Sequence, residues 1–243
     1  MTSMQAGQIT AGQAMRLAPD HAATLAAMAA AHRHGHTQVN QCQTIRHWQP
    51  SAATYCYQTH IAVADQHRDR LEWLTDVFFN AATLTRQPWY PQFAGGSSQT
   101  PGETPSPGIS RHQFIWGRFH VGLPSPRYYR QLVSLARPDA STAVIVARSV
   151  TEGPPLPAGA RLAYTLDPNG EVLHWENGRI HWHHICCTPG IALLPGRLDR
   201  WFINSLRRLG LDRAERDTYR AEAEGLRDWL QSAEPEDALD FTH

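Results

Sequence analysis

The stretch LHWENGRIHWHHICC, residues 173–187, predicts an antiparallel β-hairpin. Asn177-Gly178 is the strongest two-residue signal for a hairpin turn, because both central residues of that turn need a positive φ. A run of β-branched and aromatic residues on each side of the dipeptide is typical of paired strands. Folding the stretch about this turn gives three cross-strand pairs: Glu176 with Arg179, Trp175 with Ile180, and His174 with His181.

Side chains alternate across a strand, so the hairpin divides its residues between two faces. His174, His181 and His183 share one face, where three neighbouring imidazoles can ligate zinc or can simply lie in water. No carboxylate is placed to orient these rings, as metal-binding histidines usually require. We therefore expect a hydrated histidine face that binds no metal. The other face carries Leu173, Trp175, Ile180, Trp182, His184 and Cys186.

The composition is that of a folded globular domain. The chain has 243 residues, of which 42% are hydrophobic, enough for one buried core. Its net charge is zero and it has no long basic run, which argues against nucleic-acid binding. All 22 basic residues are arginine, which indicates a GC-rich coding sequence and excludes lysine Schiff-base and Walker-type phosphate chemistry. No motif calls for a cofactor.

The chain ends and the cysteines indicate a cytoplasmic protein. The first sixteen residues lack the order of a secretory signal, and no apolar run has the length of a membrane span. The four cysteines show no C-x-x-C spacing, which suits a reducing compartment. We expect a flexible tail over residues 1–16, one domain over 17–231 and an acidic tail over 232–243.

The order of elements predicts an α+β fold. Residues 18–35 have helical composition, with Pro19 suited to a first turn, and residues 65–84 have helical spacing. Strands joined by short turns form an antiparallel sheet, and such a sheet can curve around a long closing helix and leave a hollow for a ligand. The remaining predicted segments are strands at 38–48, 53–63, 112–123, 127–138, 142–153, 160–166 and 171–187, a Gly/Ser/Pro loop at 94–110, turns at 138–139 and 167–170, and a closing helix at 194–230.

Four short motifs in this order resemble START lipid-transfer domains, which have the helix-grip fold. The resemblance extends over about residues 37–230 and implies a curved antiparallel sheet wrapped around a long C-terminal helix, with an internal cavity and no metal. Two features depart from the family: Tyr128 stands where an acid is usual, and the glycine-rich loop replaces a strand. No internal acid–arginine pair, as in sterol-binding members, is identified. The motifs are WYP (89–91), LPSPRYY (123–129), IVARSVTEGPPLP (145–157) and GIALLPGRLDRWFINSLRRLGL (190–211).

The candidate site residues are aromatic, arginine and histidine side chains of the strands. Phe114, Trp116, Arg118 and His120 alternate with Ile115, Phe119 and Val121; either set can face the interior. Arg148 alternates into a valine face, where a charge must be paired or must touch a ligand. The candidate catalytic residues are Arg148, His120 and Tyr128, and the candidate ligand-binding residues are Trp116, Arg118, His120, Arg148, Tyr164, Trp182 and Trp201.

Two functions of different class follow from the resemblance. The first is a carrier or binding protein that encloses a hydrophobic small molecule, such as a lipid, a sterol-like or a polyketide-like compound. The alternative is a bacterial helix-grip enzyme of the cyclase, aromatase or dehydratase type, acting on a polyketide-like or other natural-product intermediate. A shaped apolar cavity would orient such a substrate while Tyr, His or Arg moves protons. The sequence leaves the ligand and the oligomeric state open.

Overall fold

The computed structural model describes most of the sheet and the two helices that pack on it. The statements below concern these described residues: 9–33, 42–51, 54–64, 69–80, 93–102, 104–119, 127–153, 155–158, 160, 162–163, 166–189, 221, 224–226 and 228–229.

In these ranges nine strands form one sheet. Their spatial order is β1-β2-β9-β8-β6-β5-β4-β3, and β7 pairs with β5 alongside this path. The pairs along the path are antiparallel, whereas β7 runs parallel to β5. The strands are β1 (Cys42–Ser51), β2 (Thr54–Ala64), β3 (Phe93–Gln99), β4 (Ile109–Phe119), β5 (Arg127–Asp139), β6 (Thr142–Ser149), β7 (Leu162–Ala163), β8 (Leu166–Glu176) and β9 (Arg179–Pro189).

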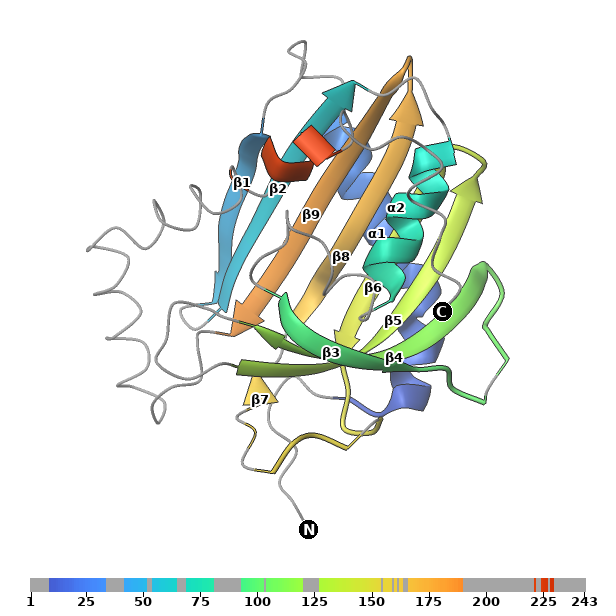
Figure 1. Ribbon diagram of the computed structural model, residues 1–243, viewed down its shortest axis with the longest axis vertical. Helices are drawn as coiled ribbons and strands as arrows, with labels where there is room; N and C mark the ends of the chain where they lie inside the picture. Colours follow the sequence, from blue (N-terminus) through green and yellow to red (C-terminus); the bar gives the residue numbers. More distant parts are fainter. Residues whose placement is uncertain are drawn as a thin grey trace, which may run out of the picture.

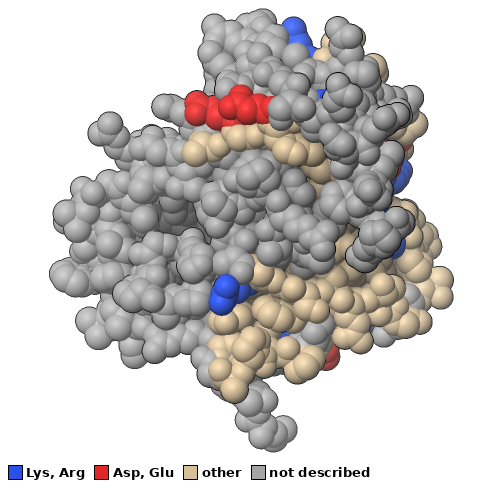
Figure 2. All heavy atoms as spheres, in the orientation of Figure 1, with Lys and Arg blue, Asp and Glu red and all other residues tan. Residues whose placement is uncertain are grey.

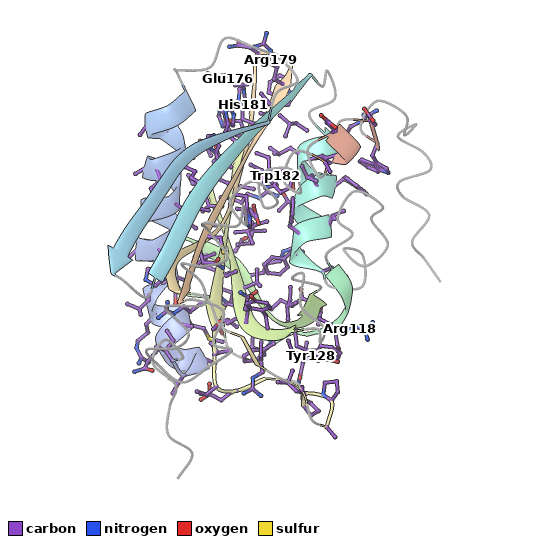
Figure 3. All side chains as sticks on the ribbon, turned by 90° about the vertical axis from the view of Figure 1, so that its left-hand side faces the viewer. Arg118, Tyr128, Glu176, Arg179, His181 and Trp182 are labelled. Carbon is purple, nitrogen blue, oxygen red and sulfur yellow. The ribbon has the colours of Figure 1, made fainter. Side chains whose placement is uncertain are left out.

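Two helices cover opposite faces of this sheet. Helix α1 (Ala11–Arg33) lies behind it and α2 (Asp69–Phe79) in front, while β3 and β4 bend toward the α2 side (Figure 1). The quarter-turned view separates the three layers, with α1 and α2 on either side of the strands (Figure 3). We call the two sides of the sheet the α1 face and the α2 face. This arrangement confirms the predicted α+β class with an antiparallel sheet.

Each face has its own apolar core. On the α1 face the buried alanines of α1 and Leu25 pack on Val144, Val146, Val172 and Ile185. The α2 face is built from larger side chains than the alanine-rich α1 face. Its cluster includes Leu71, Leu74, Val77, Phe78, Ile145, Leu173, Ile180, Trp182 and Leu226.

Helix α1 begins at Ala11, six residues before the predicted domain boundary, so residues 11–16 of the expected N-terminal tail are helical. Thr10 and Gln13 form a reciprocal cap: the Thr10 amide donates to Gln13 Oε1 (2.9 Å) and the Gln13 amide donates to Thr10 Oγ1 (3.2 Å). The Glu152 carboxylate accepts a further bond from the Ala11 amide at 2.7 Å. A cap of this kind fixes the first turn of the helix.

Pro19 lies inside α1. The composition had predicted that it would lie in the first turn of the helix, and this prediction is wrong. Proline has no N–H, so Met15, four residues earlier, loses its partner within the helix. The Ser106 hydroxyl donates to the Met15 carbonyl at 3.3 Å and replaces that bond. The segment before β4 therefore satisfies the carbonyl that the proline leaves without its helical partner.

Two further predictions of irregular chain are corrected. The glycine-rich stretch after Phe93 begins with strand β3, which pairs with β4 around a bulge between Phe93 and Gly96. The predicted loop at 94–110 is thus a strand up to Gln99. The predicted turn at 167–170 lies within β8, where the register shifts between Leu166 and Gly170. Turn-forming residues serve as bulges in both places.

The predicted closing helix lies mostly outside the described residues. Residues 221, 224–226 and 228–229 are helical. Leu226 is fully buried in the α2-face cluster, and the Trp229 ring stacks on Trp73 of α2, with ring centroids 3.8 Å apart. The end of this segment therefore packs on α2.

The described surface shows no extended charge of one sign in the view of Figure 2, where basic and acidic atoms form separate small groups. Exposed ion pairs join α2 to the sheet, Asp76 with Arg111 and Glu72 with Arg137. In the part of the chain that the structure describes, no helix has the length and apolarity needed to cross a membrane.

Candidate functional site

The predicted hairpin is confirmed. Asn177 and Gly178 have φ values of 52° and 71°, both positive as the two-residue turn requires. The observed register gives the three predicted cross-strand pairs and continues to Glu171 opposite His184. The two predicted faces are also observed, with Trp182 in the α2-face core and His183 on the opposite side.

A polar cluster lies on the α2 face of β8 and β9. The Glu171 carboxylate accepts a hydrogen bond from Trp182 Nε1 at 2.6 Å through Oε2, and its Oε1 lies 2.6 Å from His184 Nδ1. Glu171 is 8% exposed and Trp182 is 2% exposed, so water is largely excluded from these bonds. Hydrogen bonds to a carboxylate in such surroundings are short and strong.

The neighbours of the His184 imidazole favour its charged form. Burial by itself disfavours the imidazolium, but the adjacent Glu171 carboxylate and hydrogen bonds to Cys186 and Glu171 raise the pKa of His184 well above 6.5. Glu171 and His184 therefore form a largely buried pair in which the imidazolium is favoured. Because Nδ1 faces the carboxylate, the ring is fixed in one orientation.

Cys186 completes the cluster on the imidazole side. It stands two residues after His184 on β9, so both side chains project from the same face of the sheet. The thiol is free and 8% exposed. Carboxylate, imidazole and thiol thus follow one another within a single patch, which we call the Glu–His–Cys patch.

The Glu–His–Cys patch borders an apolar wall. The Phe78 and Trp182 rings meet at a centroid distance of 5.0 Å, and Leu173 and Ile180 are almost fully buried beside them. Trp182 lies between the sheet and α2 (Figure 3). A charged pair at the edge of such a wall can bind a polar atom of an otherwise apolar molecule, or can transfer a proton to it.

The opposite face of the hairpin is not hydrated, and this prediction is wrong. His181 is 7% exposed and His183 is fully buried. Helix α1 and its neighbouring strands cover this face, and polar partners replace the water. His60 Nε2 lies 3.1 Å from His181 Nδ1, and the His60 ring stacks on His183 at 4.2 Å.

The buried histidine row is tied to other strands by further hydrogen bonds. Gln58 Nε2 lies 3.4 Å from both His183 Nδ1 and the Met28 carbonyl of α1. His174 Nδ1 lies 2.8 Å from Thr142 Oγ1 on β6. Among the described side chains, no group of three or more His, Cys, Asp or Glu is arranged to hold a metal ion. The absence of metal in the native protein stays a prediction.

The structure divides the predicted site residues between the two faces. Trp116 and Arg118 alternate with Ile115, which belongs to the α2-face core, whereas Phe114 packs against the α1-face residues. Trp116 and Arg118 therefore lie on the same face of the sheet as Phe114, the α1 face, and not on the α2 face with Trp182. The ring centroids of Trp116 and Tyr128 are 6.0 Å apart. Tyr128 pairs with Arg118 across β4 and β5. Figure 3 shows Arg118 and Tyr128 at the far end of the sheet from His181.

Arg148 also lies apart from Trp182. It is opposite Leu132 on β5 and between Val146 and Val150, which all pack on the α1 face. Of the other candidates, His120, Tyr164 and Trp201 lie outside the described residues. Only Trp182 among the described candidates belongs to the α2-face cluster.

Glu171 was not among the predicted site residues, although the sequence contained the signal for it. Extending the hairpin register from Glu176 opposite Arg179 places Glu171 opposite His184. Glu171 is thus a carboxylate beside a histidine of the hairpin, but it lies on the α2 face and not on the face of His181 and His183.

The comparisons with known proteins give no match to a protein-family model or to a curated protein. Among solved structures the chain is similar to the lipid transfer and protein localization domain of human StarD13, with 14% identity over 79% of this chain and 90% of that one, at a TM-score of 0.49. A STAR-related lipid transfer protein fragment from Xanthomonas axonopodis has 14% identity, covering 77% of this chain and 98% of its own, also at 0.49.

A second class of solved structure is similar at a lower score. The di-domain ARO/CYC protein BexL from the BE-7585A biosynthetic pathway has 12% identity and a TM-score of 0.39, over 76% of this chain and 52% of its own.

Proposed function

We propose that this chain encloses a hydrophobic small molecule between the α2 face of the sheet and the closing segment, in a helix-grip arrangement, as a carrier or binding protein. A lipid, a sterol-like or a polyketide-like compound fits this description. Support comes from the apolar α2 face, on which Trp182 lies, and from the packing of Leu226 and Trp229 on the same side. A cytoplasmic location and a role in bacterial natural-product metabolism are part of this proposal.

The observation that carries the proposal is the Glu171–His184 pair at the edge of an apolar wall. A buried ion pair contributes little net stability, because desolvation offsets most of the attraction. Its presence beside Trp182 therefore favours a role in recognition, in which the charged pair binds the polar end of the ligand while the wall contacts the rest.

The proposal is tested on the freshly purified full chain. Native mass spectrometry should reveal a co-purified organic molecule, and NBD-labelled cholesterol or phosphatidylcholine should bind with a rise in fluorescence. Glu171→Gln should weaken binding about tenfold, the effect of losing one hydrogen bond to a charged group. The matched control is Ser134→Ala, a buried change on the α1 face. A chain that carries no organic molecule and binds neither probe contradicts the proposal.

One observation favours a second candidate, an enzyme of the cyclase or dehydratase type. A charged imidazole fixed by a carboxylate can donate a proton to a carbonyl and take it back in the next step. A linear poly-β-ketone thioester is the appropriate test substrate, with products followed by liquid chromatography and mass spectrometry. Turnover by the wild type that His184→Gln abolishes supports the enzyme, and turnover unaffected by that change removes this site from it.

A further inference from the structure

Four buried polar side chains form a row on the α1 face of β2 and β9. They are Gln58, His60, His181 and His183, with exposed fractions between 0% and 7%. The His60 ring stacks on His183 with centroids 4.2 Å apart and on His181 with centroids 5.3 Å apart. We call these residues the Gln–His row. Because water is largely excluded, the hydrogen bonds within the row limit how many protons its rings can carry.

Gln58 fixes the protonation state of His183. Its Nε2 lies 3.4 Å from the Met28 carbonyl oxygen of α1 and 3.4 Å from His183 Nδ1. A carbonyl oxygen can only accept, so the amide nitrogen of Gln58 faces Met28 and donates to it. The same NH2 group donates its second hydrogen to His183 Nδ1, which must therefore carry a lone pair. This arrangement requires a neutral His183 ring.

A further proton on His183 breaks this connection between the sheet and α1. The Nδ1–H group of an imidazolium would point at the NH2 group of Gln58, donor against donor. Turning the amide over would let Gln58 Oε1 accept from His183, but that oxygen would then face the Met28 carbonyl oxygen. In either position one hydrogen bond is lost in a buried site, where unpaired polar groups are costly.

The pair of His60 and His181 has a similar limit. His60 Nε2 lies 3.1 Å from His181 Nδ1, so one of these nitrogens donates and the other accepts. At most one of the two rings can be charged while this bond exists. With His183 neutral as well, the closed row binds at least two protons fewer than three fully protonated imidazoles.

His174 of β8 lies beside the row without sharing its limit. Thr142 Oγ1 donates to Asp139 Oδ2 at 3.0 Å and so accepts from His174 Nδ1, which is 2.8 Å away. His174 Nε2 lies 3.9 Å from Glu176 Oε2. Both ring nitrogens can therefore carry hydrogens, and a charged His174 ring is attracted to Glu176.

The other described charged groups near the row do not favour protons on it. Arg179 stands two residues before His181 on β9 and shares its face, so its positive charge repels a charged His181 ring. On α1, Arg16 and Asp20 are exposed, and His21 lies about 10 Å along the helix from the carbonyl that belongs to the row. Closure of the row is thus best suited to uncharged rings.

We propose that the Gln–His row is a proton-sensitive latch, which holds the C-terminal half of α1 to β2 and β9 at neutral pH and releases it when exposed imidazoles take up protons. Only the open form can protonate all three rings, so opening takes up protons and acid favours it. The contribution of His184 is fully present below pH 6.5 and has the opposite sign. The inference goes beyond the proposed function, because it assigns a regulatory device to the face that the ligand proposal does not use.

Hydrogen–deuterium exchange of the full chain, followed by mass spectrometry, tests the latch. Rates corrected for the pH dependence of unprotected amides give opening constants for residues 25–33 and 54–64. Two extra imidazoles of pKa about 6.5 should raise these constants roughly thirtyfold between pH 6.5 and 5.5. Peptides from β4 and β5 should stay nearly constant. Unchanged protection of residues 25–33 overturns the proposal, and so does an equal loss in β4 and β5, since the whole domain then unfolds.

Asparagine variants separate the protons from the packing. Asparagine Oδ1 takes the approximate place of a histidine Nδ1 and accepts a hydrogen bond without titrating. His183→Asn should therefore reduce the response from roughly thirtyfold to about fivefold, because one proton-binding ring is lost. If near-ultraviolet circular dichroism shows that this variant does not fold, His181→Asn gives the same comparison. An undiminished response overturns the latch.

His174→Asn is the matched control, because it makes the same change to a buried histidine on the same face. Since His174 can be charged in the closed form, this variant should keep the full thirtyfold response. A reduction equal to that of His183→Asn would overturn the assignment of proton sensing to the Gln–His row.

Discussion

Glu171 and His184 face each other across β8 and β9 and form a 2.6 Å contact between Oε1 and Nδ1 that water scarcely reaches. The carboxylate raises the pKa of His184 well above its ordinary value. Replacing Glu171 with glutamine should lower the pKa of His184, because burial disfavours the imidazolium and the carboxylate that favours it is then gone. Histidine ring signals followed by NMR through a pH titration measure this shift, with His184→Gln used to assign the resonance. An unchanged titration would refute the pairing.

The same pair gives the stability of the protein a pH dependence of known sign. Because the folded-state pKa of His184 is raised, its contribution is fully present below pH 6.5, the ordinary value, and is lost as the pH rises through the folded-state pKa. Urea unfolding at a series of pH values above 6.5 should show this loss in the wild type. Glu171→Gln should give a shallower decline, and parallel profiles for the two proteins would contradict the assignment.

The buried histidine row should make a large contribution to stability. His183→Ala removes a ring that stacks on His60 and leaves Gln58 without one of its partners. We expect a loss of roughly 2–4 kcal/mol in the free energy of unfolding, from the cavity and the lost bond. Adding His181→Ala should increase the loss. The exposed change Gln99→Ala is the control, for which an effect within about 0.5 kcal/mol is expected. Equal effects in His183→Ala and the control would mean that this face is hydrated after all.

The hairpin shows how far the sequence alone can lead. Asn177-Gly178 fixes the turn, and period-two alternation then fixes both faces and the register. Which face meets water is a tertiary property, because α1 covers the histidines from more than a hundred residues earlier in the chain. His183 is therefore buried although the hairpin itself contains no sign of its cover.

The candidate site was harder to predict for the same reason. Alternation groups Arg148 correctly with Val146 and Val150, but it does not say which helix packs on that face. Trp182 was among the candidates as an aromatic residue of a strand, whereas Glu171 was not, although the hairpin register places Glu171 opposite His184. Local sequence thus specifies pairings well, whereas the position of the helices decides which pairs form a site.

Gly170 is required by the close approach of β6 and α1. A Cβ atom at this position would lie 2.0 Å from the Ile145 carbonyl oxygen and 2.8 Å from Leu25 Cδ1. Gly170→Ala should therefore cost roughly 3 kcal/mol or more, since the backbone must move to admit the methyl group. Thermal and urea unfolding measure the loss. Gly102→Ala, where a Cβ has open space, is the control. Adding Leu25→Ala should not restore stability, because the backbone oxygen remains; recovery would identify the side chain as the obstacle.

The stacking of Trp73 on Trp229 holds the end of the closing segment on α2. The two rings are nearly parallel, with an interplanar angle of 14° and centroids 3.8 Å apart. A double-mutant cycle with Trp73→Ala and Trp229→Ala should give a coupling free energy of about 0.5–1.5 kcal/mol, typical of aromatic pairs. Stacked indoles also couple their electronic transitions, so each single variant should remove the same far-ultraviolet circular dichroism band. Trp175→Ala, a partly buried tryptophan on β8, is the matched control and should keep that band. Additive free energies and a band that survives Trp229→Ala would show that the segment does not rest on α2 in solution.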